Sequence, residues 1–418
     1  MFRKCNSALA HASLGFLVLP TIISFSRMLS RLAIGLDKQP QLISHLAKGS
    51  SDEGGAKETL PERAANIVRG AFVTCLNDRY SGVKDGKPEG KKLGIYKTAN
   101  ICLKILFQCR KTRNAEQIFT NIDNQSPPLA IYPKSERVAY LYYLGRYLFS
   151  VNHFYRAQKA LQEAYSLCHT KCLQQRRLIL IYLIASNIVL GRFPSHNLYE
   201  RQEARGLMDK FHPICKAIAS GNLVAFRTLL ESQSPNSAWF RHFRILLQLR
   251  NRGEVLVWRS IIRKAFLISG NQGDAASKKA PTISLQDVLV FMNALDRPQG
   301  TGKQDDYVDP DFEGAAGMLI DHPAVDMLEV ESIVSALVDQ GLMNGYISHR
   351  LSRFAIQGAK QIGGLAAGFP NVWRTLTDNA KEQGVPGWKE QRIGVSRSGF
   401  GGGMVVNLSG ARPVGSGA

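Results

Sequence analysis

The sequence has far fewer acidic residues than basic ones, and its cysteines are scattered along the chain. It has 53 lysines and arginines against 33 aspartates and glutamates, a formal charge of +20. Such a charge favours a polyanionic partner, which could be nucleic acid, an acidic protein or a membrane surface. The seven cysteines are odd in number and form no CxxC pair. We therefore expect reduced thiols in a reducing compartment and no disulfide framework.

The sequence also lacks the spacings that catalysis or metal binding would need. The tetrapeptide at 300–303 has neither the upstream glycine nor the following serine or threonine of a phosphate-binding loop. The acidic loop at 305–313 contains Pro310 and lacks the ligand order of an EF-hand. Cys168, His169 and Cys172 have no second pair of ligands with matching spacing. We predict no catalytic residue, no metal site and no cofactor, so that the protein is not an enzyme.

Residues 1–36 contain no acid, and their apolar run at 14–25 is interrupted by Pro20 and is too short to span a bilayer. They could be a secretory or mitochondrial targeting segment, or an extension outside the fold that results from a misplaced start ahead of Met28. A polar, glycine-rich linker follows at 49–58. We expect residues 1–60 to be poorly ordered, to make few contacts with the body and to be removable with almost no change in melting temperature.

The stretch 138–165 is the pattern around which the rest of the chain is arranged. Its first half places apolar residues at helical spacing, and its second half has the small or apolar positions Ala157, Leu161 and Ala164. Together with Gly145, the small residues predict two antiparallel helices that approach closely, as in a tetratricopeptide (TPR) unit. Such a helical hairpin needs stacked neighbours. We predict irregular TPR-like helical repeats over 61–233.

Several further helices follow from the same rules. Pro61 is well placed for a first turn, and 174–190 is apolar nearly all round, which predicts a helix buried on most sides. Helices are expected at 200–219 and 223–231, with a turn at Gly221. A long basic helical stretch at 236–268 is expected to be interrupted at Gly253.

The pattern changes after Ser269. A short strand at 283–285, a helix at 286–295, a second helix from Val325 to Leu337 with Gly341 as its C-cap, and a hairpin of 345–348 and 354–356 are expected. Strand, helix, helix, hairpin is the order of a winged helix. We assign 234–381 to this module, treat 299–322 as an inserted loop, and expect the glycine-rich tail at 382–418 to be disordered.

A helical stack that leads directly into a winged helix resembles the PCI family. The sequences at 90–122, 126–165 and 174–195 are similar to the subgroup that holds PCI-domain-containing protein two, the Thp-one subunit of the TREX-two complex and the fungal homologues of signalosome subunit twelve. The resemblance covers about 61–377. It implies a nuclear scaffold subunit with a small acidic Dss-one/Sem-one-type protein and other PCI or helical scaffold subunits as partners.

Clusters of cations stand out from this background. Residues 236–268 have seven lysines and arginines against the single acid Glu254, and residues 91–113 have seven with no acid. The predicted hairpin adds three basic residues. We expect one continuous cationic surface that binds RNA or double-stranded nucleic acid through phosphates. Its candidate residues are Arg241, Arg244, Arg259, Arg263, Lys264, His349, Arg350 and Arg353.

The sequence therefore predicts a mainly α, non-enzymatic scaffold that binds nucleic acid and couples transcription to mRNA processing or export. The alternative is a scaffold of the signalosome or proteasome-lid type, in which the winged helix makes only protein contacts. An unidentified enzyme is the third possibility. The expected location is the nucleus, with the cytoplasm as a second location and no membrane partner.

Overall fold

The computed structural model describes residues 2–39, 41–42, 59–79, 82–273, 279–296 and 325–381. The predicted linker at 49–58, the insertion at 299–322 and the tail at 382–418 lie outside the described residues. The helices before the C-terminal module are α1 (Phe2–Ala10), α2 (Leu19–Asp37), α4 (Leu60–Leu76), α5 (Ile95–Gln108), α6 (Arg113–Gln125), α7 (Lys134–Ser150), α8 (Phe154–Leu167), α9 (Leu173–Val189), α10 (His196–Tyr199), α11 (Met208–Ser220), α12 (Leu223–Leu230), α13 (Ser237–Phe243) and α14 (Leu246–Ser269). A two-stranded hairpin, β1 (Val83–Lys84) with β2 (Lys87–Pro88), lies between α4 and α5.

The N-terminal helices belong to the body of the protein. Helix α2 packs against both α4 and α5, and α1 packs against α4. Leu9 and Ile22 are fully buried, and Leu19 and Ile23 are almost fully buried. The expectation that residues 1–60 make few contacts is therefore wrong for residues 2–39. The buried positions of α2 recur at helical spacing, so the part of the apolar run that lies in this helix contributes its buried face, whereas Leu14, Phe16 and Leu17 before it are exposed.

The segment Gly15–Asp37 is also long and apolar enough to cross a membrane, judged by length and composition alone. A signal sequence and a core helix of a soluble protein pass the same test. In this structure Leu19, Ile22 and Ile23 of this segment are buried in the core, where α2 packs against α4 and α5, whereas Phe16, Leu17, Met28 and Leu32 are exposed.

The central hairpin of α7 and α8 has the predicted close approach. Ala157 is fully buried, and a Cβ added at Gly145 would lie 2.5 Å from the Cγ of Leu161 on the facing helix. That distance is shorter than the non-bonded contacts of real Cβ atoms, so only glycine fits there without a shift of Leu161. The small residues of both helices therefore set the spacing of the hairpin.

Replacing Ala157 by leucine is expected to lower the free energy of unfolding by about 1–3 kcal/mol, because three extra carbons would overpack this crossing. The measurement is chemical denaturation of the full chain. Gln162→Leu, at an exposed position of the same helix, is the matched control and should change stability little. Equal stability of the two variants would contradict the repeat assignment.

The middle of the chain follows the predicted pattern, except within 200–219 and at the break in the basic stretch. Helix α9 is buried on all sides from Ile179 to Ser186, as expected, although its first turn is exposed, and Gly221 forms the turn before α12. The region 200–219 is not one helix, because a 3₁₀ turn, η4 (Gln202–Ala204), precedes α11. Tyr165, on α8, donates a hydrogen bond to Glu203 inside this turn.

The basic stretch breaks at Arg244 and not at Gly253. Arg244 has φ +56° and ends α13, whereas α14 runs uninterrupted through Gly253. Gly253 is buried, and a Cβ there would lie 2.8 Å from the Cζ of Phe226 on α12. This glycine is therefore needed for helix contact and does not end the helix.

The last part of the chain is a small module of helices around a sheet, which we call the C-terminal module (residues 279–296 and 325–381). It comprises β3 (Thr282–Ser284), α15 (Leu285–Asp296), α16 (Met327–Asp339), β4 (Gly345–Ser348), β5 (Arg353–Ile356), α17 (Ala359–Ile362), α18 (Gly364–Gly368) and α19 (Val372–Lys381). The strands form an antiparallel sheet in the order β3-β5-β4, in which Phe354 pairs with both Ile283 and Ile347. The predicted order of strand, helix, helix and hairpin is present among these residues.

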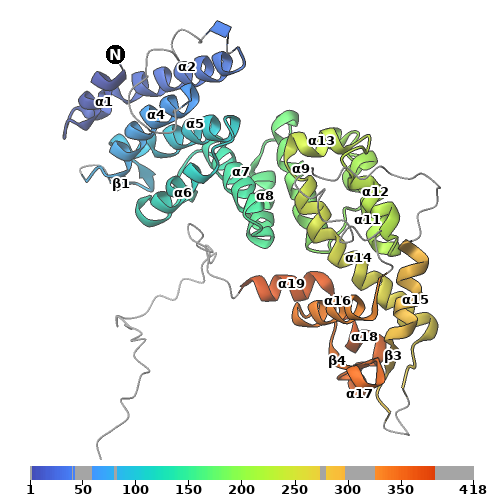
Figure 1. The fold of residues 1–418 in the computed structure, drawn as a ribbon. Coiled ribbons are helices and arrows are strands. Elements are labelled where there is room, and N and C mark those ends of the chain that lie inside the picture. Colours follow the sequence, from blue (N-terminus) through green and yellow to red (C-terminus); the bar gives the residue numbers. More distant parts are fainter. Residues whose placement is uncertain are drawn as a thin grey trace, which may run out of the picture.

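Figure 1 shows how these parts are arranged. Helices α1 to α6 lie at one end, the hairpin of α7 and α8 leads to α9–α14, and the C-terminal module lies at the far end of α14. The long helix α14 therefore connects the helical repeats to the C-terminal module, which it contacts through α15, β3 and α16.

Candidate nucleic-acid interface

The cations predicted on 236–268 lie at different places along α13 and α14. Arg241, Arg244, Arg250 and Arg252 are exposed, at or near the start of α14. At about 1.5 Å of rise per residue, Arg244 and Arg263 are roughly 28 Å apart along the helix direction. In Figure 1, α13 lies far from β4 and α17. The structure therefore does not bring the cations of α13 and the start of α14 into one surface with those near the end of α14.

Arg259 is occupied within the protein. Its Nε and one terminal nitrogen donate hydrogen bonds to the carbonyls of Leu342 (3.1 Å) and Pro370 (2.7 Å), so it joins α14 to the C-terminal module. Burial, with a smaller contribution from Arg263, lowers the pKa of its guanidinium to about 10. The placement of Arg259 on a nucleic-acid surface is thus corrected to a structural role at this junction.

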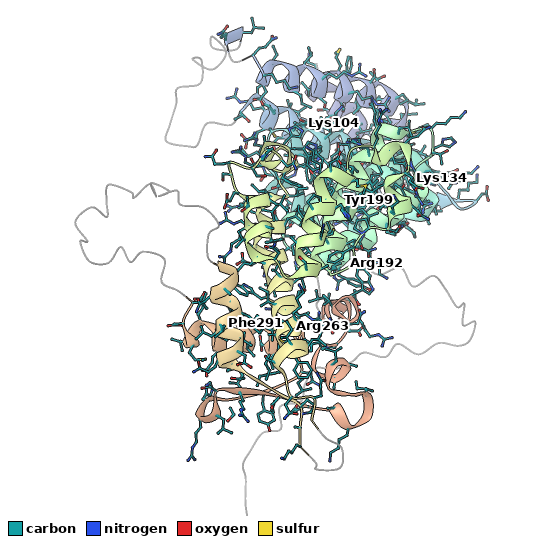
Figure 2. The ribbon with its side chains drawn as sticks, turned by 90° about the vertical axis from the view of Figure 1, so that its right-hand side faces the viewer. Lys104, Lys134, Arg192, Tyr199, Arg263 and Phe291 are labelled. Carbon is teal, nitrogen blue, oxygen red and sulfur yellow. The ribbon has the colours of Figure 1, made fainter. Side chains whose placement is uncertain are left out.

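Arg263 and Lys264 follow Arg259 on α14. Arg263 is half-buried beside the C-terminal module, as Figure 2 shows. Lys264 is exposed, and its ammonium group donates to the carbonyl of Ser220 at the end of α11. Of the two, Arg263 has no polar partner among the residues that the structure describes.

The hairpin between β4 and β5 presents its cations outward. His349 is exposed, and its Nδ1 lies 2.7 Å from a carboxylate oxygen of Glu331 on α16. Arg350 and Arg353 are exposed, and neither pairs with a carboxylate within 325–381 or the other described ranges. Long side chains at a hairpin tip can reach a phosphate without rearrangement of the backbone.

The second cationic cluster, at 91–113, is mostly paired inside the protein. Lys91 lies 3.2 Å from Asp78 with both side chains almost fully buried, and Lys92 donates to the Leu76 carbonyl. Lys97 pairs with Glu136, and Lys111 pairs with Glu62. The exposed remainder is Lys104, Arg110 and Arg113. Acids from other parts of the sequence therefore pair with three of the seven cations of this acid-free segment, and a main-chain carbonyl accepts from a fourth.

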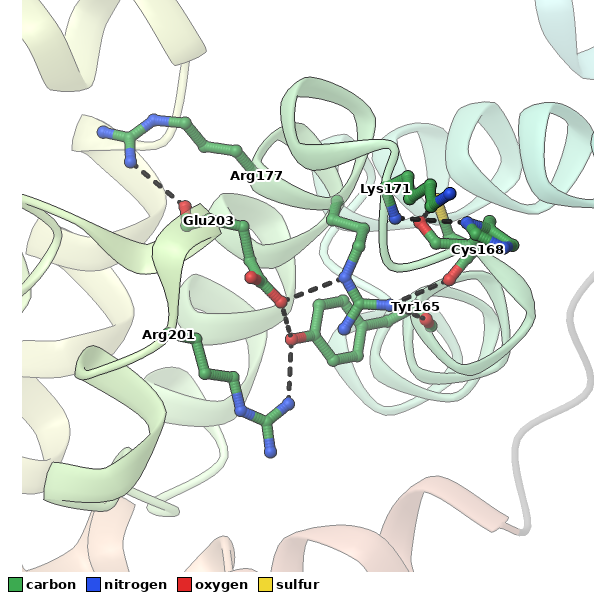
Figure 3. A network of polar contacts seen from close by, with 8 residues as sticks. Tyr165, Cys168, Lys171, Arg177, Arg201 and Glu203 are labelled. Carbon is green, nitrogen blue, oxygen red and sulfur yellow. Dashed lines mark hydrogen bonds and ion pairs between the residues drawn. The ribbon is translucent and has the colours of Figure 1, made fainter.

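A buried polar network lies at the end of α8, and all of its groups are engaged in structural contacts (Figure 3). Glu203 accepts hydrogen bonds from Tyr165 (2.6 Å) and from Arg176 (3.0 Å). Arg176 also donates to the Cys168 carbonyl, and Arg201 donates to the hydroxyl of Tyr165. Burial alone would raise the pKa of Glu203, yet these hydrogen bonds and the charge of Arg176 hold it below its ordinary value. The network ties the end of α8 to α9 and η4.

The cysteines are free thiols in this structure. Burial raises the pKa of Cys75, Cys102 and Cys215 to about 12, which keeps these thiols protonated. Within the described ranges, no three His, Cys, Asp or Glu side chains are grouped so that they could hold a metal ion.

Comparison with known proteins identifies relatives along most of the chain. A PCI domain-containing protein of Schizosaccharomyces pombe is 27% identical over 339 residues, which are 81% of this chain and 68% of that protein. The Protein CSN12 homolog of Gibberella zeae is 31% identical over 287 residues, 66% of this chain and 55% of its own. PCI domain-containing protein 2 of Danio rerio is 26% identical over 296 residues, 71% of this chain and 62% of its own. No family model matches the chain.

The chain thus spans between about half and two thirds of the length of these relatives. Its mainly α architecture of stacked helical pairs followed by a small C-terminal module agrees with a PCI-type helical-repeat fold. The resemblance predicted from the sequence is therefore confirmed, and over most of its length the chain is homologous to PCI domain-containing proteins.

Proposed function

We propose that this protein is a non-enzymatic scaffold subunit of a nuclear multiprotein complex and binds nucleic acid through a basic surface of its C-terminal module, which we take to be a winged helix. In this role it would couple transcription to mRNA processing or export. Homology to PCI domain-containing proteins supports the scaffold part of the proposal. The proposed partners are other PCI or helical subunits and a small acidic protein of the Dss-one/Sem-one type.

The observation that supports nucleic-acid binding most strongly is the pair Arg350 and Arg353. Both are exposed at the hairpin, and no carboxylate in the described part of the chain neutralises them. Arg263 adds a third cation on the neighbouring helix. Flexible cations of this kind contact phosphates and give affinity with little choice of base sequence. We therefore propose binding to RNA or double-stranded nucleic acid through the backbone.

Replacing Arg263, Arg350 and Arg353 together by glutamine should weaken binding to every nucleic-acid sequence alike. It should also reduce the slope of log Kd against log salt by roughly 0.9 for each phosphate that the variant no longer neutralises. Fluorescence anisotropy with labelled duplexes at several salt concentrations measures both quantities. The matched control is the triple variant Lys134→Gln, Lys171→Gln, Lys216→Gln, which removes the same charge at exposed positions of the helical repeats.

Unchanged affinity and slope in the first variant would remove the hairpin surface from the proposal. The alternative function is a scaffold of the signalosome or proteasome-lid type that makes only protein contacts. Resemblance to the homologues of signalosome subunit twelve supports that alternative. If the triple variant kept nucleic acid and lost an acidic protein partner in pull-down experiments, the alternative would be preferred.

A further inference from the structure

A continuous row of aromatic rings crosses four helices of the repeat region. Phe107 on α5 contacts Tyr143 on α7 with 5.2 Å between ring centroids, and Tyr143 contacts Tyr142 at 5.3 Å, in both cases with tilted rings. Tyr142 lies 6.2 Å from Tyr182 on α9, and Tyr182 lies 6.3 Å from Phe243 on α13. Tyr142 and Tyr143 are half-buried, so part of each remains accessible to solvent.

One arginine lies in the middle of this row. The guanidinium of Arg146 is 4.9 Å from the ring centroid of Phe107, 5.3 Å from that of Tyr142 and 5.0 Å from that of Tyr182. It donates a hydrogen bond to the Tyr142 hydroxyl (3.2 Å). Among the described residues no carboxylate pairs with it. Cation–π contacts therefore hold this charge in place and leave it uncompensated.

Two exposed arginines extend the positive charge along the row. Arg110 follows α5, three residues after Phe107, and Arg244 follows Phe243 directly. Phe243 and the Arg146 guanidinium both lie against the Tyr182 ring, at 6.3 Å and 5.0 Å from its centroid, which places Arg244 at the same end of the row as Arg146. Burial, and then the charges of Arg110 and Arg146, lower the pKa of Arg244. No acid within 59–79, 82–273 or the other described ranges pairs with Arg110 or Arg244. Like charges gathered in this way are stabilised by an anionic ligand.

We propose that this aromatic–arginine strip (Phe107, Arg110, Tyr142, Tyr143, Arg146, Tyr182, Phe243 and Arg244) is a second binding surface, one that takes single-stranded nucleic acid. Arg110 and Arg244 would contact phosphates, while the accessible edges and faces of Tyr142 and Tyr143 would receive unpaired bases. Rings interleaved with cations are the arrangement that binds single strands with little sequence preference. An acidic peptide would use the charges and leave the rings without a role.

The strip is separate from the hairpin surface. Arg244 precedes α14, whereas Arg263 lies near its other end, so the two surfaces are at opposite ends of a 24-residue helix. In Figure 1, α5, α7 and α13 lie well away from β4 and α17. Binding at the strip therefore does not depend on the hairpin residues, and each surface can be tested alone.

The first experiment uses the full chain and a fluorescein-labelled 15-nucleotide oligouridine in anisotropy titrations. Arg110→Gln with Arg244→Gln should weaken binding about tenfold or more and lower its salt dependence, because two phosphates are no longer neutralised. The control Lys134→Gln with Lys216→Gln removes two exposed charges from α7 and α11 and should bind within about twofold of the wild type. In the variant with Arg263, Arg350 and Arg353 replaced by glutamine, the affinity for oligouridine should still exceed the affinity for a duplex.

The second experiment separates stacking from charge. Tyr143→Leu should weaken oligouridine binding about fivefold or more, because a stacked base contributes roughly 1–3 kcal/mol. It should leave binding of an abasic oligonucleotide of the same length unchanged. Tyr143→Phe keeps the ring and should bind oligouridine as the wild type does. Thermal melting of each variant establishes that it is folded, and the exposed arginine pair tests the proposal even if Tyr143→Leu does not fold.

The proposal is overturned if Arg110→Gln with Arg244→Gln binds oligouridine as tightly as the charge-matched control does. It is also overturned if that variant loses only the binding of a 15-residue oligoglutamate, since the strip would then bind an acidic protein. If oligouridine binding is lost in the Arg263, Arg350 and Arg353 triple variant but not in the Arg110 and Arg244 variant, the single-strand site lies on the C-terminal module. That result would also overturn the proposal.

Discussion

Replacement of Ile22 by alanine is expected to lower the free energy of unfolding by about 2–5 kcal/mol. Ile22 is fully buried on the face of α2 that contacts α4 and α5, so the variant leaves a cavity in the core. If residues 1–60 were an extension outside the fold, the same change would have no effect. Urea denaturation of the full chain is the measurement.

The matched control for this experiment is Leu32→Ala. Leu32 lies on the same helix and is 54% exposed, so its truncation should change stability by less than about 0.5 kcal/mol. Equal effects of the two substitutions would mean that the burial of α2 is not maintained in solution. Stability loss in Ile22→Ala alone would place α2 in the folded core and not in a membrane.

Replacement of Glu203 by alanine is expected to cost about 3–5 kcal/mol of stability, because it leaves the buried charge of Arg176 without its carboxylate partner. The side chains of Arg176 and Glu203 are 10% and 8% exposed, so water compensates little. The hydroxyl of Tyr165 would lose its acceptor at the same time. Glu200→Ala, at an exposed position three residues earlier, is the control and should be nearly neutral.

The same carboxylate predicts a pH dependence. The pKa of Glu203 is lower in the folded protein than the ordinary value, so its contribution to stability is complete above that ordinary value. The contribution is lost as the pH falls through the folded-state pKa. We expect the unfolding free energy of the wild type to fall more steeply in acid than that of Glu203→Gln. Parallel curves for the two proteins in the acidic range would contradict the assigned role of Glu203.

Several of the cations that cluster in the sequence are engaged inside the folded protein. Lys91, Lys97 and Lys111 form ion pairs with acids that are distant in sequence, and Arg259 donates hydrogen bonds to two main-chain carbonyls. Charge counted along the chain therefore overstates the charge available to a ligand. Among the described residues, the arginines without a carboxylate partner at the hairpin and at the strip are the ones that carry our two binding proposals. They are Arg350 and Arg353 at the hairpin, and Arg110, Arg146 and Arg244 at the strip.

The sequence by itself determined the helical pairs and the order of elements in the C-terminal module. These features follow from local rules: apolar spacing in α7 and α9, small residues at Gly145 and Ala157, and turn residues at Gly221 and Gly341. Such signals act between residues near one another in the chain or across one helix crossing. They can therefore be read without knowledge of the rest of the fold.

The tertiary structure decided the features that depend on distant residues. Whether α2 is buried depends on the apolar surfaces of α4 and α5, and whether α14 continues through Gly253 depends on the ring of Phe226. The aromatic–arginine strip was not predicted, although 140–147 places four tyrosines around Arg146, because its other rings come from α5, α9 and α13. Pairing, burial and convergence of side chains are properties of surfaces that meet only after folding, so spacing along the chain cannot specify them.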